Sequence, residues 1–131
     1  MNSLQAKVKE FHDKYSLPDS AWPALPAPAV LSLRLRLIRE ETEEFAEAGA
    51  AGDLAGSIKE LADLLYVVLG AANAYGIDIE PFFNEVHRSN MTKVWPDGTI
   101  HKDQHGKVLK PPTYSPAELD PILAAQSPQT I

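Results

Sequence analysis

The segment from Leu61 to Ala72 is apolar at almost every position, and it limits what this chain can fold into. Its flanks predict a helix that is capped by Asp53, runs to about Tyr75 and stops at Gly76. A helix that is apolar nearly all round must be buried on most sides. The run contains an aspartate and is too short to span a bilayer, so we expect protein to bury it.

Helical periodicity and capping residues predict four main helices and one short last helix. Prolines make residues 18–28 irregular, between the first two helices. The stretch "SPAEL" places Ser115 as a cap, a proline at the first helical position and a glutamate three residues after the cap, which predicts the last helix. The expected helices cover residues 4 to about 17, 29 to about 49, 53 to about 75, 78 to about 91, and 115–125.

Residues 94–131 are expected to form an extended C-terminal segment of a single domain that spans residues 1–131. Asp97-Gly98 and His105-Gly106 separate short extended pieces there, which indicates a loop or a small hairpin. The predicted fold is therefore all-α, a four-helix bundle with this loop or hairpin and the short last helix. Because one small chain can hardly cover the apolar third helix, we expect a helical dimer, with a closed monomeric bundle as the alternative.

Composition narrows the classes of partner. The net charge of −6 disfavours generic binding to nucleic acid phosphate. Without cysteine the chain has no disulfide, thiolate metal site or cysteine nucleophile. The N-terminus lacks the apolar core of a signal peptide, so we expect a cytoplasmic protein with no membrane partner.

Two pairs of acids border the core-forming segments. Glu41 and Glu44 are three residues apart, as are Glu60 and Asp63, so each pair shares a helix face. If the two helices pack antiparallel across the turn at Gly49–Gly52, the pairs can face each other. Clustered carboxylates repel, their pKa values rise on burial, and a divalent cation reverses that balance. Oxygen ligands of this kind suit Mg²⁺ or Mn²⁺.

Two other readings of the acids stay open at this point. The acids can be solvated and paired with nearby cations, namely Arg34, Arg36, Arg39 and Lys59. A di-iron carboxylate bundle also uses glutamates on facing helices. Such a site requires a histidine three residues after a glutamate, and none of these glutamates has one.

The arrangement Glu40-Glu41-x-x-Glu44, a gap, then Glu60-x-x-Asp63 resembles the EExxE…ExxD signature of the all-α NTP pyrophosphatases. These are the MazG-like proteins, with dimeric dUTPases and phosphoribosyl-ATP pyrophosphohydrolases as relatives. "VHRSNMTK", residues 86–93, is similar to the later Asn-x-x-Lys element of that family, and residues 97–119 resemble the tail of its phosphoribosyl-ATP-pyrophosphohydrolase-like branch. The resemblance covers about residues 29–120.

The resemblance implies an enzyme that cleaves a nucleoside triphosphate between its α and β phosphates, giving a monophosphate and pyrophosphate. It implies Mg²⁺, with Mn²⁺ possible, on four ligands: Glu41, Glu44, Glu60 and Asp63. Such an ion neutralises phosphate oxygens and activates water near neutral pH. Glu40 stands one residue off the ligand face and is our candidate for the catalytic base.

The resemblance also places phosphate contacts on Asn90 and Lys93, and we add Arg88 and Lys59 as candidate substrate-binding residues. The alternative for Arg88 is a cation that stabilises a helix C-terminus. Trp22, in the proline-rich stretch, is a candidate to stack on the base, with a packing role as its alternative.

The residues do not identify the substrate. House-cleaning of the nucleotide pool, with dUTP as the first guess, competes with phosphoribosyl-ATP hydrolysis, and a non-enzymatic helical dimer module is the rival from another class. The partners expected are the triphosphate and a second copy of the chain, as a homodimer or a dimer of dimers.

Overall fold

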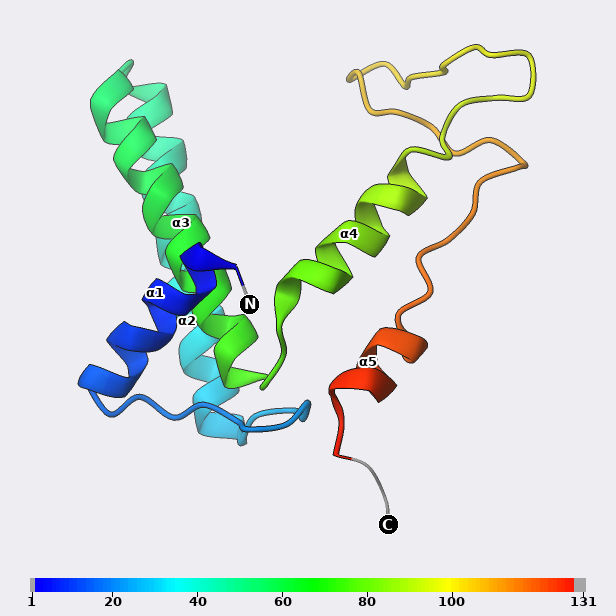
Figure 1. The fold of residues 1–131 in the computed structure, drawn as a ribbon. Coiled ribbons are helices and arrows are strands. Elements are labelled where there is room, and N and C mark those ends of the chain that lie inside the picture. The colour runs from blue at the N-terminus through cyan, green and yellow to red at the C-terminus, as the bar shows by residue number, and fades with distance from the viewer. Residues whose placement is uncertain (1, 129–131) are drawn as a thin grey trace. The chain divides into compact units, whose positions relative to one another are not determined.

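The computed structural model describes residues 2–128, and its regular elements are five helices (Figure 1). They are α1 (Ser3–Lys14), α2 (Pro28–Ala50), α3 (Leu54–Ala74), α4 (Ile79–Asn90) and α5 (Asp120–Gln126). Residues 2–128 contain no strand, only one isolated antiparallel bridge between Lys102 and Val108. The all-α class predicted from the sequence is confirmed. None of the described helices combines the length and apolar character that crossing a membrane requires.

The chain separates into two compact units. One comprises the chain up to Ile79 together with the residues from Gln126, and the other runs from Glu80 to Ala125. In the first unit the Gln126 amide accepts a hydrogen bond from the Asp78 N–H at 2.8 Å and donates to the Asp78 carbonyl at 3.0 Å. This pair of bonds holds the end of α5 against the segment that follows α3.

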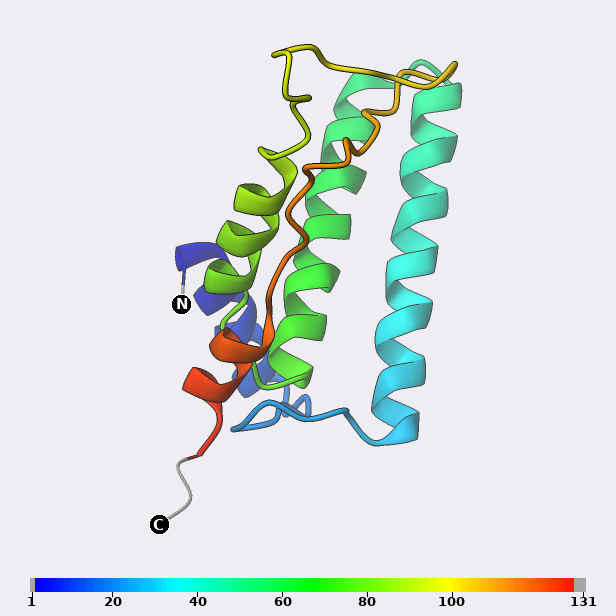
Figure 2. The ribbon, with the colours of Figure 1, turned by 90° about the vertical axis from the view of Figure 1, so that its right-hand side faces the viewer.

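The antiparallel pair of α2 and α3 forms the long axis of the first unit (Figure 2). A three-residue connection joins them, and Gly52 within it has a φ of 68°, a left-handed conformation that glycine adopts without strain. The Asp53 carboxylate then accepts a hydrogen bond from the Gly56 N–H at 2.9 Å and caps α3, as predicted. At the other end, Gly76 follows α3 with a φ of 72°, as its predicted stop requires.

Helix α1 packs against α3, and the buried residues of α1 are Gln5, Val8 and His12. The Gln5 side chain is fully buried, and both its amide nitrogen and its oxygen form hydrogen bonds. Its amide nitrogen donates to Asn73 Oδ1 at 2.9 Å and to the Ile77 carbonyl at 2.7 Å, and its oxygen accepts from the Ile79 N–H at 3.0 Å. One glutamine therefore joins α1, α3 and the segment that leaves α3.

A second buried polar cluster lies at His12, about two turns further along α1. His12 Nδ1 is 2.6 Å from Asp19 Oδ1, and His12 Nε2 is 3.3 Å from an Arg34 guanidinium nitrogen. Gly70 makes room for this cluster, because a Cβ there would lie 2.9 Å from the Arg34 side chain. Arg34 is thus a buried partner of His12 and does not pair with the acids of α2 and α3.

The apolar third helix is buried over only part of its length. Its buried residues all lie between Leu69 and Ala74, whereas Leu61, Leu65 and Val68 expose 51%, 48% and 41% of their surface. An apolar face this large on a single chain agrees with the argument for a dimer, which stays a prediction.

In the second unit the last helix begins later than predicted. The structure starts it at Asp120, so the assignment of residues 115–125 with Ser115 as cap is wrong. The reason is that the "SPAEL" backbone is bound to α4. The Ser115 N–H donates to Thr92 Oγ1 at 2.9 Å, the Pro116 carbonyl accepts from Arg88 at 3.1 Å, and the Glu118 N–H donates to Glu85 at 3.0 Å.

We expect the Gln5 contacts to contribute strongly to stability. Gln5→Met keeps the side-chain shape but leaves the Ile79 N–H and the Ile77 carbonyl without their partner. Since an unsatisfied buried group costs roughly 1–3 kcal/mol, the free energy of unfolding should fall by about 2 kcal/mol or more. Urea denaturation measures this, with the exposed Lys7→Met as control, expected within about 0.5 kcal/mol of wild type. Equal loss in both variants would contradict the role of Gln5.

Candidate metal centre

The short connection between α2 and α3 sets the register of their acids. Glu44 and Glu60 each lie eight residues from Gly52, and Glu41 and Asp63 each lie eleven residues from it. In an antiparallel helix pair, residues equally distant from the turn lie at the same height. Both predicted pairs are therefore brought to the same level of the hairpin.

Three of the four predicted ligands converge. Glu41, Glu60 and Asp63 each offer a carboxylate oxygen, and these oxygens lie within 4.8 Å of one another. All three side chains are half-buried, and one oxygen each of Glu41 and Glu60 is buried without a hydrogen-bond partner. Buried oxygens without partners are uncommon in proteins and point to an ion or water as the missing partner. A hard divalent cation fits this all-carboxylate donor set.

The electrostatics of the cluster agree with that fit. Burial, followed by contact with Glu60 and the charges of Glu44 and Asp63, raises the pKa of Glu41 to about 7. The pKa of Glu44 is also raised, first through its contact with Glu60, although Glu44 is exposed and is not one of the three converging side chains. Like charges held together without a counter-ion disfavour ionisation.

Part of the solvated-acid alternative is also visible. Lys59 pairs with Asp63 at 2.5 Å and lies 3.5 Å from Glu60, and Arg36 lies 3.8 Å from Glu40. Lys59 is therefore at the cluster itself, beside two predicted ligands. Glu40, the candidate base, directly precedes Glu41 in α2 and is exposed.

Of the other predicted substrate-binding residues, Trp22 belongs to the first unit and three belong to the second. Trp22 is exposed in the loop before α2, at the end of the hairpin far from the turn. That loop is bound to the end of α3, because the Tyr75 carbonyl accepts a hydrogen bond from it. Tyr75 lies fifteen residues after Glu60, which corresponds to about 22 Å along the helix axis. The structure thus does not bring Trp22 to the carboxylates within this unit, and its role stays a prediction.

Asn90, Lys93 and Arg88 belong to the second unit, at the end of α4. The Lys93 N–H donates to the Asn90 carbonyl at 3.2 Å, so these two lie in one turn. The Arg88 guanidinium binds Glu85 at 2.7 Å, Ser115 at 3.1 Å and the Pro116 carbonyl at 3.1 Å. These bonds give Arg88 a structural role. The sequence did not reveal it, because Ser115 and Pro116 lie 27 and 28 residues further along the chain.

We predict that the metal-free protein loses stability as the pH rises. The pKa of Glu41 is about 7 in the folded protein, against an ordinary pKa of 4.5. Between pH 4.5 and pH 7 the folded state therefore binds more protons than the unfolded state. The free energy of unfolding must then fall with rising pH across this window. Urea denaturation in EDTA from pH 5 to pH 8 measures the slope. Glu41→Gln should flatten it and Glu43→Gln should not, whereas an unchanged slope in Glu41→Gln would contradict the clustering.

The chain is similar to a solved structure and to one protein family. A crystal structure of a "putative NTP pyrophosphohydrolase" from Exiguobacterium sp. 255-15 is similar over 95% of this chain and 94% of its own, with 23% identity and a TM-score of 0.48. No curated protein matches the sequence significantly. The sequence profile of the family described as "Phosphoribosyl-ATP pyrophosphohydrolase" matches residues 8–90, which include both acid pairs. Because this match covers more than half of the chain, the protein belongs to the phosphoribosyl-ATP pyrophosphohydrolase family.

Proposed function

We propose that the protein is a Mg²⁺-dependent nucleoside triphosphate pyrophosphohydrolase, which cleaves the bond between the α and β phosphates and releases pyrophosphate. The observation that carries the proposal is the convergence of Glu41, Glu60 and Asp63 with two buried carboxylate oxygens that have no partner. Membership of a pyrophosphohydrolase family supports the reaction class. Our first candidate substrate is dUTP.

The three carboxylates, joined by Glu44 from the exposed edge, would hold the ion. A bound Mg²⁺ supplies neutralisation of phosphate charge and activation of water. The three half-buried side chains come from one level of the hairpin and would hold the ion partly shielded from solvent, which would strengthen its attraction for phosphate.

Lys59 and Glu40 have roles beside the ion. Lys59 lies at the cluster, paired with Asp63, and its ammonium would contact a phosphate oxygen of the bound substrate. Glu40 is paired only at 3.8 Å with an exposed arginine, so its carboxylate can accept a proton from the attacking water.

The end of α4 supplies the remaining phosphate contacts in this proposal. Lys93 offers a point charge and Asn90 a neutral amide donor from the same turn. Arg88 contributes by holding residues 115–118 against α4, so that we assign it a supporting role rather than direct contact with substrate.

A homodimer is part of this proposal. Leu61, Leu65 and Val68 continue along α3 from the carboxylate cluster and are about half exposed. Burial of such side chains contributes about 25 cal/mol per Å² of apolar surface, which favours a second copy of the helix pair as the covering partner.

Phosphoribosyl-ATP is the second candidate substrate, because the matching family is described by hydrolysis of that compound. Both substrates present a triphosphate-type chain to the metal and both release pyrophosphate. They differ at the base, where phosphoribosyl-ATP carries a second ribose phosphate.

We expect pyrophosphate, not orthophosphate, as the first product. Purified protein with millimolar Mg²⁺ is given dUTP, the other deoxynucleoside and ribonucleoside triphosphates, and phosphoribosyl-ATP, and both products are quantified. Preference for dUTP supports house-cleaning, and preference for phosphoribosyl-ATP supports the second candidate. Orthophosphate as the primary product, or no turnover of any compound, would refute the proposed reaction.

The amide variants of the acids test which side chains hold the metal. Glu41→Gln, Glu44→Gln, Glu60→Gln and Asp63→Asn remove an anionic ligand with little change of shape. Each should lower turnover on the order of a hundredfold or more.

Glu43→Gln is the matched control for these variants. Glu43 is exposed and lies two residues from Glu41, about 200° round the helix, so its variant should stay within a few fold of wild type. Circular dichroism must show all five variants still helical. Inactivity of Glu43→Gln equal to that of Glu44→Gln would mean that the ligands lie on a different face of α2.

A further inference from the structure

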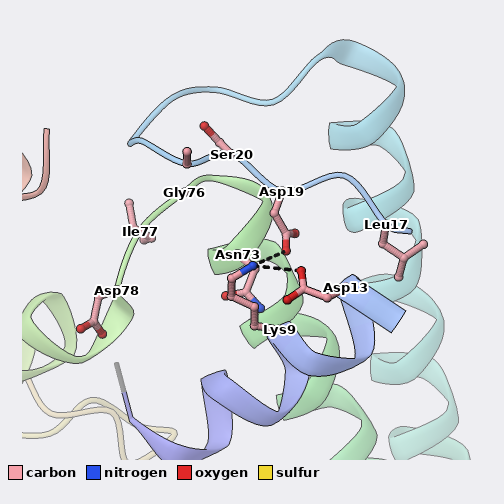
Figure 3. A pocket seen from close by; sticks show the side chains of 10 residues that line it. Lys9, Asp13, Leu17, Asp19, Ser20, Asn73, Gly76, Ile77 and Asp78 are labelled. Atoms are coloured by element: carbon pink, nitrogen blue, oxygen red, sulfur yellow. Dashed lines mark hydrogen bonds and ion pairs between the residues drawn. The ribbon is translucent and has the colours of Figure 1, made fainter. Parts of the chain in front are cut away.

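An open pocket of about 510 Å³ lies at the opposite end of the first unit from the metal centre. Figure 3 shows its walls: Lys9 and Asp13 come from α1, Asp19 from the following loop, and Asn73 from the last turn of α3. Asn73 is thirteen residues beyond Glu60 on the same helix, or about 20 Å along its axis. The pocket therefore shares no residue with the carboxylate cluster.

The Asn73 amide presents a donor that no group among residues 2–128 accepts. The Ile79 N–H can only donate, so the group facing it at 3.0 Å must be the Gln5 oxygen. The Gln5 nitrogen then donates to Asn73 Oδ1 at 2.9 Å, which fixes the orientation of the Asn73 amide. Asn73 is only 4% exposed, and its Nδ2 has no hydrogen-bond partner.

Asp19 presents a matching acceptor. The Arg34 guanidinium can only donate, so His12 Nε2, 3.3 Å from it, accepts, and His12 Nδ1–H donates to Asp19 Oδ1 at 2.6 Å. Asp19 Oδ2 is buried and accepts no hydrogen bond, with the Lys9 ammonium 4.0 Å away. The two internal chains of bonds thus leave one donor and one acceptor on the pocket wall.

Charge limits what this pocket can hold. Its walls carry three carboxylates, Asp13, Asp19 and Asp78, against the single ammonium of Lys9, which is already paired with Asp13 at 3.0 Å. Phosphate groups are repelled by such a surface. At Gly76 the pocket wall lies so close to the Trp22 carbonyl that an added Cβ would collide with it.

We propose that this pocket binds a small phosphate-free polar molecule that presents an acceptor to Asn73 Nδ2 and a donor to Asp19 Oδ2. The amide edge of a nucleobase, with N–H beside C=O, has this chemistry, and so do the vicinal hydroxyls of a sugar. Each satisfies two buried groups that otherwise lack a hydrogen-bond partner among the described residues. The site is separate from the catalytic reaction and does not rest on it.

The test uses the full chain carrying Glu60→Gln, so that binding at the metal centre does not contribute. The probes are uridine, 1-methyluracil, ribose and inorganic phosphate, and NMR follows the side-chain amide resonances of Asn73. Uridine should shift these resonances in a saturable way and phosphate should not. A shift with 1-methyluracil assigns the base edge as the ligand, and a shift with ribose assigns the hydroxyls. The proposal is overturned if none of the three uncharged probes shifts the signals, or if phosphate shifts them equally.

Two variants add a second readout, uridine affinity by calorimetry. Asn73→Asp keeps the acceptor for Gln5 but removes the free donor, and Asp19→Asn keeps the acceptor for His12 but replaces the free acceptor with a donor. Each should weaken uridine binding about tenfold or more, and Asp19→Asn carries the test if Asn73→Asp does not fold. Asp13→Asn, whose side chain is 65% exposed at the pocket edge, should stay within about threefold. Unchanged affinity in Asp19→Asn would overturn the assignment.

Discussion

The antiparallel pairing of α2 and α3 is the constraint on which the candidate site depends. Three residues connect the helices, and Gly52 takes the left-handed conformation that so short a turn requires. So short a turn sets the register, so residues at equal distances from it lie at the same height. A shift of one residue would rotate an acid by about 100° and take it off the shared face. The turn thus positions Glu41, Glu60 and Asp63 although it contains none of them.

The other end of the first unit is held by hydrogen bonds more than by apolar packing. The buried apolar residues there are small or few, namely Val8, Leu69, Ala72 and Ala74. Gln5, His12, Arg34 and Asn73 are buried among them, and each finds a partner. Because the partners of a buried polar group must stand in particular places, this network determines how α1 docks on α3 more narrowly than apolar contact would.

Local signals in the sequence predicted the helices well, and tertiary contacts explain what they missed. Asp53 and Gly76 mark the ends of α3 because a cap and a left-handed turn involve only neighbouring residues. The residues after Ser115 carry an equally good capping pattern, yet there the backbone binds Thr92, which lies 23 residues away. For the same reason periodicity found α1 but not the burial of Gln5, since a glutamine is buried only where the distant Asn73 receives it.

The candidate site was predictable because its signal is the spacing of acids along two helices, which the helical repeat converts into shared faces. The spacing could not show that some of these carboxylates have a basic partner and others do not. Glu40 and Asp63 have basic neighbours, as the solvated-acid reading requires, but exposed ion pairs of that kind are worth roughly 0–1 kcal/mol. Glu41 and Glu60 each bury an oxygen that has no hydrogen-bond partner among the described residues, and the pKa of Glu41 is raised to about 7 as a result of burial and crowding. Solvation and surface pairing therefore account for the outer acids of the cluster. They leave Glu41 without an ion pair among the described residues and Glu60 with only the 3.5 Å contact to Lys59, and a divalent cation would bring the charge that is missing there.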